Sequence, residues 1–140
     1  MIRNRITRAD IVTFTRGDCH ILAREMHGAS GWPIYVLSER TFGTARHFFV
    51  MAPTGHAVDV EGVHTISGMK KQWVCEFIRE MTVEKIRRLG WGEKAHAWAT
   101  PRAEELAPHI IAEAQHSLGL AGIQAVPAIR DPMVASCLPS

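Results

Sequence analysis

Residue types suited to nucleophilic chemistry occur together in the first half of the chain, as Cys19, His47 and Asp59. A cysteine attacks as its thiolate, which a nearby imidazolium or the positive end of a helix dipole favours. The attacking thiol needs a base within hydrogen-bonding reach, and the base needs an acceptor that orients its second ring nitrogen. The three residues therefore predict a catalytic triad with Cys19 as nucleophile, His47 as base and Asp59 as orienting acid.

A helix is expected to begin close to Cys19. Over residues 17–27 the side chains at positions i, i+3, i+4 and i+7 form one helix face, and they are Cys19, Leu22, Ala23 and Met26. Asp18 precedes this pattern and is a residue type that caps helix N-termini, although its carboxylate would disfavour a thiolate unless capping engages it. The position also suits a small buried residue, which is how most free cysteines behave.

A β-hairpin is expected to carry the histidine and the aspartate. The runs 45–52 and 56–62 have the composition of strands, and the Pro-Thr-Gly sequence at 53–55 is typical of a three-residue hairpin turn. In this register the opposing pairs are Ala52 with His56, Phe49 with Asp59, and His47 with Glu61. The side chains of His47, Asp59 and Glu61 then share one face of the sheet, and either acid is positioned to orient the histidine.

The remaining segments predict one further strand and two further helices. Residues 32–38 are a short apolar run that reads as a buried strand. The four-residue spacing of Trp73, Phe77 and Met81 predicts a helix over 68–81, and Thr100-Pro101 begins another that runs to about residue 118. The expected fold class is α+β, with an N-terminal helix carrying the cysteine packed on a small antiparallel sheet and additional C-terminal helices. Residues 1–120 are expected to form a single domain, and 121–140 a loosely held C-terminal extension.

Composition excludes several classes of protein. The 16 basic and 14 acidic residues give a net charge of +2, a balance too even to indicate nucleic-acid binding. The three cysteines are too far apart for a disulfide framework or paired metal knuckles, so reduced thiols and a cytoplasmic location are expected. The first residues carry no apolar core of the kind a signal peptide has, and no apolar run reaches roughly 18 residues, so neither a signal peptide nor a membrane partner is expected.

The eight histidines and four tryptophans suggest alternative sites. The candidate metal ligands are Cys19, His20, His47, His56 and His64. None of these residues has the i, i+4 or Cys-x-x-Cys spacing that indicates a metal site, so neither a metal nor a cofactor is predicted. Tryptophans are more often core residues than lining of a binding groove in a domain of this size.

The segment Gly17-Asp18-Cys19-His20 at a helix start, followed by His47 on one strand and Asp59 on the next, resembles the papain-like and transglutaminase-like cysteine hydrolase superfamily. The resemblance covers residues 17–64. It implies acyl transfer at an amide or thioester of a protein or peptide, of the peptidase, deamidase or amidase type. In that chemistry Cys19 attacks the carbonyl, its backbone N–H stabilises the oxyanion, and His47 moves the proton.

A second class of function is also compatible with these residues. One scaffold hosts many activities, so a non-catalytic small binding or inhibitor protein on a hydrolase-like scaffold is the alternative. Preferential alkylation of Cys19 distinguishes the two, because only the enzyme requires a reactive thiol at that position. The substrate and the oligomeric state are left open.

Overall fold

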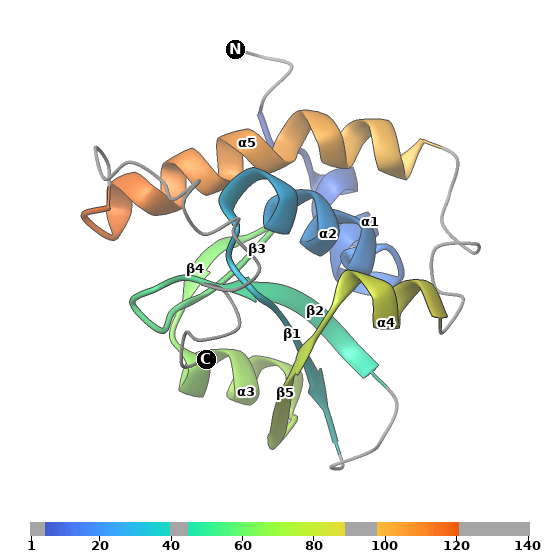
Figure 1. Ribbon diagram of the computed structural model, residues 1–140, viewed down its shortest axis with the longest axis vertical. Helices are drawn as coiled ribbons and strands as arrows, with labels where there is room; N and C mark the ends of the chain where they lie inside the picture. The colour runs from blue at the N-terminus through green and yellow to red at the C-terminus, as the bar shows by residue number, and fades with distance from the viewer. Residues whose placement is uncertain (1–4, 40–44, 89–97, 121–140) are drawn as a thin grey trace.

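The computed structural model describes residues 5–39, 45–88 and 98–120. The helices are α1 (Arg8–Arg16), α2 (Cys19–Ser30), α3 (Ile66–Trp73), α4 (Val83–Arg88) and α5 (Ala99–Ser117) (Figure 1). The strands are β1 (Ile34–Ser38), β2 (Ala45–Met51), β3 (Ala57–Asp59), β4 (Gly62–His64) and β5 (Phe77–Met81). No helix in these described ranges has both the length and the apolar character that crossing a bilayer requires.

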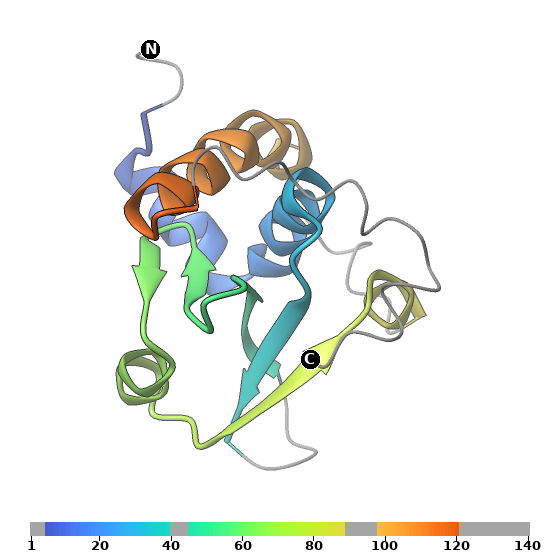
Figure 2. The same cartoon turned by 60° about the vertical axis from the view of Figure 1, so that its left-hand side comes forward.

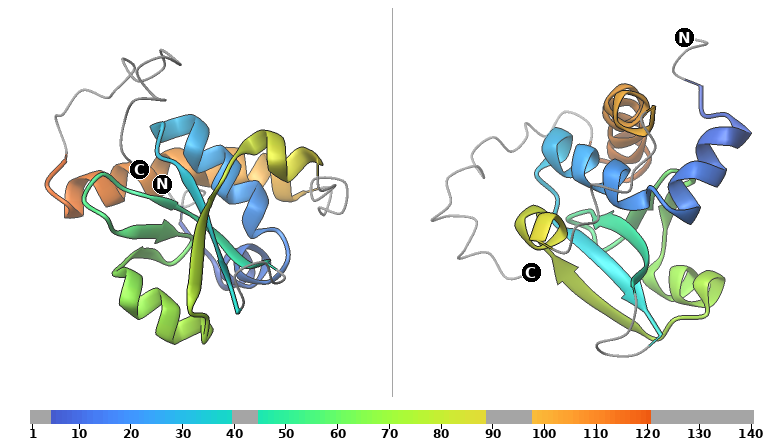
Figure 3. Two further views of the ribbon diagram at one scale, coloured as in Figure 1. Left: turned by 60° about the horizontal axis from the view of Figure 1, so that its bottom comes forward. Right: turned by 90° about the vertical axis from the view of Figure 1, so that its right-hand side faces the viewer.

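The five strands form one sheet in the order β4-β3-β2-β1-β5, and every neighbouring pair is antiparallel. Helices α1, α2 and α5 lie over one face of the sheet, and α3 lies against the other (Figure 2, Figure 3). The fold is therefore α+β, with the cysteine-bearing helix packed on a small antiparallel sheet and further helices toward the C-terminus, as the sequence predicts.

Hydrophobic cores fill the space on both sides of the sheet. The larger core lies between the sheet and α1, α2 and α5, and its buried side chains include Phe14, Leu22, Met26, Phe48, Val50, Val58, Leu106 and Ile110. The smaller core is under α3 and consists of Leu37, Phe49, Ala57, Met69 and Cys75. Strand β2 alternates between the two, because successive side chains of a strand point to opposite faces.

The hairpin between β2 and β3 has the predicted turn and register. The Gly55 amide donates to the carbonyl of Ala52 at 2.8 Å, and the Ala52 amide donates to the carbonyl of His56 at 2.8 Å. Gly55 has a φ of 89°, a left-handed conformation that a residue without Cβ adopts readily. The second strand is shorter than expected, because it ends at Asp59 and the chain turns back into β4.

The predicted helix over 68–81 is wrong beyond Trp73. Helix α3 ends there, Val74 adopts a left-handed conformation with φ 54°, and the chain continues as strand β5. Strand β5 pairs with β1 from Ser38 opposite Phe77 to Ile34 opposite Met81. Four-residue spacing fits this outcome too, because residues an even number apart share a face of a strand.

Helix α1 was not expected from the sequence. Thr7 caps it through a reciprocal capping box, in which the Asp10 amide donates to the Thr7 hydroxyl and the Thr7 amide donates to the Asp10 carboxylate. Arg102 of α5 also donates to both oxygens of Asp10, from Nε at 2.9 Å and Nη2 at 2.7 Å. This buried pair ties α1 to α5. The proposed C-terminal extension at 121–140 lies outside the described residues.

Candidate active site

Cys19 is the first residue of helix α2, as predicted. The Asp18 carbonyl accepts the first hydrogen bonds of this helix, from the amides of Ile21 and Leu22. Asp18 is the N-cap residue of this helix, as expected, but its side chain makes no capping hydrogen bond. Cys19 is 6% exposed, which places its thiol close beneath the surface at the positive end of the helix dipole.

His47 lies near the start of β2, directly after an irregularity in the strand. Leu37 of β1 pairs with His47, but the next residue, Ser38, pairs with Ala45, so Arg46 is an extra residue on β2. An extra residue of this kind bends a strand and redirects its side chains. The His47 side chain is fully buried, and its Nε2 lies 2.8 Å from Oδ2 of Asp59.

Asp59 forms hydrogen bonds through both of its carboxylate oxygens. Oδ1 accepts from the amide of Glu61 at 2.9 Å and lies 2.9 Å from Nε2 of His64, while Oδ2 contacts His47. Glu61, the other acid expected on this face, accepts instead from Nε2 of Gln72 at 3.1 Å. Of the two acids, it is Asp59 that contacts the histidine.

The His47 ring has three different neighbours. Nε2 is bonded to Asp59, and the Cys19 thiol lies close enough to the ring to raise its pKa. Nδ1 is buried and has no hydrogen-bond partner among the described residues. Trp73 of α3 covers the ring, with the two ring centroids 4.3 Å apart and the planes at 12°. The imidazole is thus held between a carboxylate, a thiol and an indole.

The local charges strongly shift the protonation of this pair. Burial by itself lowers the pKa of His47, but the hydrogen bond to Asp59, the nearby Cys19 thiol and the charge of Asp59 outweigh it and raise the pKa to about 9. Burial raises the pKa of Asp59, but hydrogen bonds from His47 and His64 outweigh it and lower the pKa to about 2. The hydrogen bond to Asp59 also raises the pKa of His64. At neutral pH His47 is therefore an imidazolium paired with a carboxylate.

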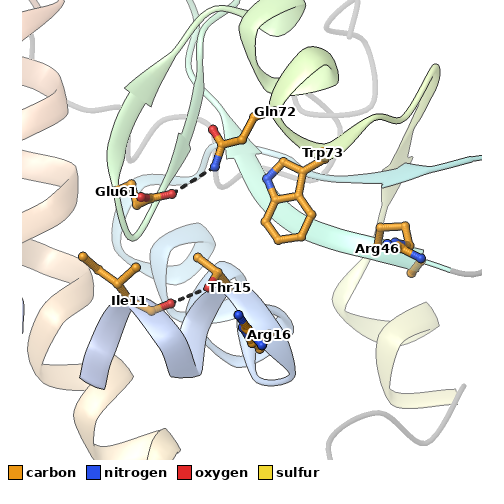
Figure 4. Close-up of a pocket in the computed structure, with 8 residues that line it drawn as sticks. Ile11, Thr15, Arg16, Arg46, Glu61, Gln72 and Trp73 are labelled. Carbon is orange, nitrogen blue, oxygen red and sulfur yellow. Dashed lines mark hydrogen bonds between the residues drawn. The ribbon is translucent and has the colours of Figure 1, made fainter. Parts of the chain in front are cut away.

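A pocket of about 680 Å³ opens next to the buried pair (Figure 4). It is lined by Ile11, Thr15, Arg16, Ala45, Arg46, Glu61, Gln72 and Trp73. Ala45 and Arg46 immediately precede His47, Trp73 stacks on it, and Arg16 lies three positions before Cys19. The pocket is thus lined by the residue that stacks on His47 and by residues that precede His47 and Cys19 in the chain.

The structure separates His20 and His56 from this site. The His20 ring packs edge-on against Phe48 at 6.1 Å, on the opposite sheet face from His47, and His56 contacts the Thr54 hydroxyl at the hairpin tip. Within the described ranges, no group of three or more His, Cys, Asp or Glu side chains is arranged to hold a metal ion. Trp32 lies in the core and Trp98 is 47% exposed, which leaves Trp73 as the described tryptophan at the site.

Two contacts of the site were not predicted from the sequence. His64, named there only as a candidate metal ligand, contacts Asp59, and Trp73 stacks on His47. His64 returns to Asp59 because a two-residue turn joins β3 to β4, pairing Asp59 with Gly62. The pattern that indicates this turn is Asp59 followed three residues later by Gly62. The Asp59 carboxylate accepts from the amide of Glu61, two residues on, and Gly62 readily adopts its φ of 105°. No local signal predicts the Trp73 contact.

No family model and no curated protein matches the sequence of this chain, and no solved structure matches its fold.

Proposed function

We propose that this protein is a cysteine-dependent acyl-transfer enzyme, of peptidase, deamidase or amidase type, that acts on a protein or peptide. The observation that carries the proposal is the buried contact of 2.8 Å between His47 and Asp59, with the Cys19 thiol as the neighbour of the same imidazole at a helix N-terminus. A thiol near an imidazole that is bonded to a carboxylate supports the roles of nucleophile, base and orienting acid for these three residues. The arrangement supports the resemblance to the papain-like and transglutaminase-like superfamily.

The reaction begins from a thiolate at Cys19 and an imidazolium at His47. The sulfur forms a bond to the carbonyl carbon of the substrate, and the carbonyl π electrons move onto oxygen. The first amides of α2, including that of Cys19, have no acceptor within the helix and stabilise the oxyanion. When the oxyanion collapses, the carbon–nitrogen bond breaks and His47 donates its proton to the departing amine.

Water then completes the cycle. His47, now neutral, removes a proton from a water molecule as its oxygen attacks the acyl carbon. The carbon–sulfur bond breaks, the acid is released, and the thiolate and imidazolium are restored. Asp59 keeps Nε2 engaged throughout, so Nδ1 is the nitrogen that exchanges the proton. Trp73 shields the imidazole–carboxylate contact from water, which strengthens their interaction.

A second candidate function has one observation in its favour. Cys19 is 6% exposed and belongs to the large hydrophobic core, as a cysteine that serves only in packing would. In that case the protein is a non-catalytic binding or inhibitor protein, and the His47–Asp59 pair serves only to stabilise the fold.

Alkylation of the three cysteines at pH 6 distinguishes the two functions. We expect iodoacetamide to modify Cys19 well ahead of Cys75, because burial raises the pKa of the Cys75 thiol. The sites of modification are read by mass spectrometry of the separate tryptic peptides, and the matched variant is His47→Gln, which removes the imidazolium beside Cys19. Equal rates at Cys19 and Cys75, or a Cys19 rate unaffected by His47→Gln, would count against the enzyme.

A further inference from the structure

The pocket beside the buried pair contains two arginines from different elements. Arg16 is the exposed last residue of α1, and Arg46 is the exposed extra residue of β2. Figure 4 shows Arg46 at one end of the pocket, Glu61 at the other, and Arg16 at the end of α1, below Trp73. The two cations therefore lie close to the segments that lead into Cys19 and His47.

The existing ion pair leaves Arg46 available to a ligand. Its contact with Glu39 is long, at 3.8 Å, and both side chains are half exposed, so water and salt compete with it. At the other end of the pocket the Glu61 carboxylate accepts a hydrogen bond from the Gln72 amide. The pocket thus presents two arginines and one carboxylate, and the carboxylate already has a hydrogen-bond donor.

We propose that this pocket binds a carboxylate-bearing side chain of an acidic peptide, adjacent to the acyl group of that peptide. Guanidinium groups match a carboxylate in planar, two-point hydrogen bonding, and an indole face provides apolar contact for the peptide next to it. Attack on the neighbouring acyl group rests on the proposed function of Cys19, whereas recognition of the acidic side chain does not.

The first experiment measures binding without catalysis. Capped peptides that differ only in one Glu, Gln or Lys residue are titrated into ¹⁵N-labelled Cys19→Ala protein, and the indole N–H signal of Trp73 is followed by NMR. That signal is assigned with a Trp73→Phe variant. We expect the Glu peptide to bind about tenfold more tightly than the Gln peptide at low salt, because each arginine should contribute a factor of about three to the affinity. The Lys peptide should bind weakest of the three.

Charge variants test the origin of this preference. The double variant Arg16→Gln/Arg46→Gln should bind the Glu and Gln peptides equally, while Arg87→Gln, which removes an exposed arginine of α4 outside the pocket lining, should keep the preference. The site is refuted if the Glu peptide leaves the Trp73 signal unmoved, or if the double variant retains the preference of the parent.

A parallel alkylation experiment on the cysteine-containing protein separates this inference from the proposed function. The ratio of the iodoacetate rate to the iodoacetamide rate at Cys19 should fall about tenfold in the double variant, because only iodoacetate carries a carboxylate. If Cys19 is reactive but the ratio of the two alkylation rates is unchanged in the double variant, the proposed binding of an acidic side chain is refuted and the proposed enzyme is not. If Cys19 is unreactive but the protein still prefers the Glu peptide, the proposed enzyme is refuted and the proposed binding of an acidic side chain is not.

Discussion

Replacing Asp59 with asparagine should remove the charge that keeps His47 protonated in the interior. The pKa of His47 is raised from 6.5 to about 9, and that of Asp59 is lowered from 3.8 to about 2. At 1.36 kcal/mol per pKa unit the first shift corresponds to roughly 3 kcal/mol and the second to roughly 2 kcal/mol. The two free energies differ because Cys19 contributes to the pKa shift of His47, whereas His64 contributes to that of Asp59. They describe one ion pair, so its contribution to the free energy of unfolding is about 2–3 kcal/mol, counted once.

The sign of each shift gives the pH range in which this contribution is present. The raised pKa of His47 stabilises the fold fully below about 6.5, and the stabilisation is lost as pH rises through about 9. The lowered pKa of Asp59 stabilises the fold above about 3.8, and the stabilisation is lost as pH falls through about 2. The difference in stability between the parent and Asp59→Asn should therefore be largest near pH 5–6 and shrink toward pH 10.

Urea unfolding at a series of pH values measures this difference, and NMR titration of the imidazole measures the pKa of His47 directly. In Asp59→Asn we expect that pKa to drop markedly, because burial continues to disfavour the charged ring. Glu61→Gln is the matched control and should change stability by less than about 0.5 kcal/mol, since its carboxylate is exposed. The reasoning fails if Asp59→Asn unfolds with the same pH profile as the parent, or if His47 in the parent titrates near 6.5.

Three further substitutions test other parts of the structure. Cys19→Ala should abolish activity on a peptide substrate while lowering the free energy of unfolding by only about 1–2 kcal/mol, measured by urea denaturation; a fully active variant would end the enzyme proposal. Arg102→Leu should destabilise the protein by about 3–5 kcal/mol, because it leaves the buried carboxylate of Asp10 without its cation, and thermal unfolding against Arg87→Leu provides the comparison. Gly55→Ala should cost about 1 kcal/mol at the hairpin turn, where φ is positive, whereas the same change at Gly17, which has open space and no positive φ, should cost less.

The turn at 53–55 explains why much of the site was predictable. A hairpin turn of defined length sets the register of its two strands, and register decides which side chains share a face. His47 and Asp59 could therefore be placed on the same side of the sheet from their distances to Gly55 alone. The helix start at Cys19 was equally local, because an apolar pattern following Asp18 is enough to indicate it.

The errors arose where the local pattern fits two structures. Trp73, Phe77 and Met81 fit a helix face and a strand face alike, and the pairing of β5 with β1 decided between them. The turn after Asp59 was missed because the predicted strand continued smoothly through Glu61. Its consequence is large, since the turn brings His64 to Asp59 and removes Glu61 from competition for His47.

The sequence by itself determined the α+β class, the hairpin register and the helix start that carries the thiol, because each depends on interactions between residues close together in the chain. Only the tertiary structure decided that the Cys19 thiol lies near the His47 ring, that Trp73 covers the ring, and that Arg16 and Arg46 line one pocket. These contacts join separate elements, and their distances depend on how α1, α2 and α3 pack on the sheet. Packing of this kind is set by the whole core at once, which is why no local pattern reveals it.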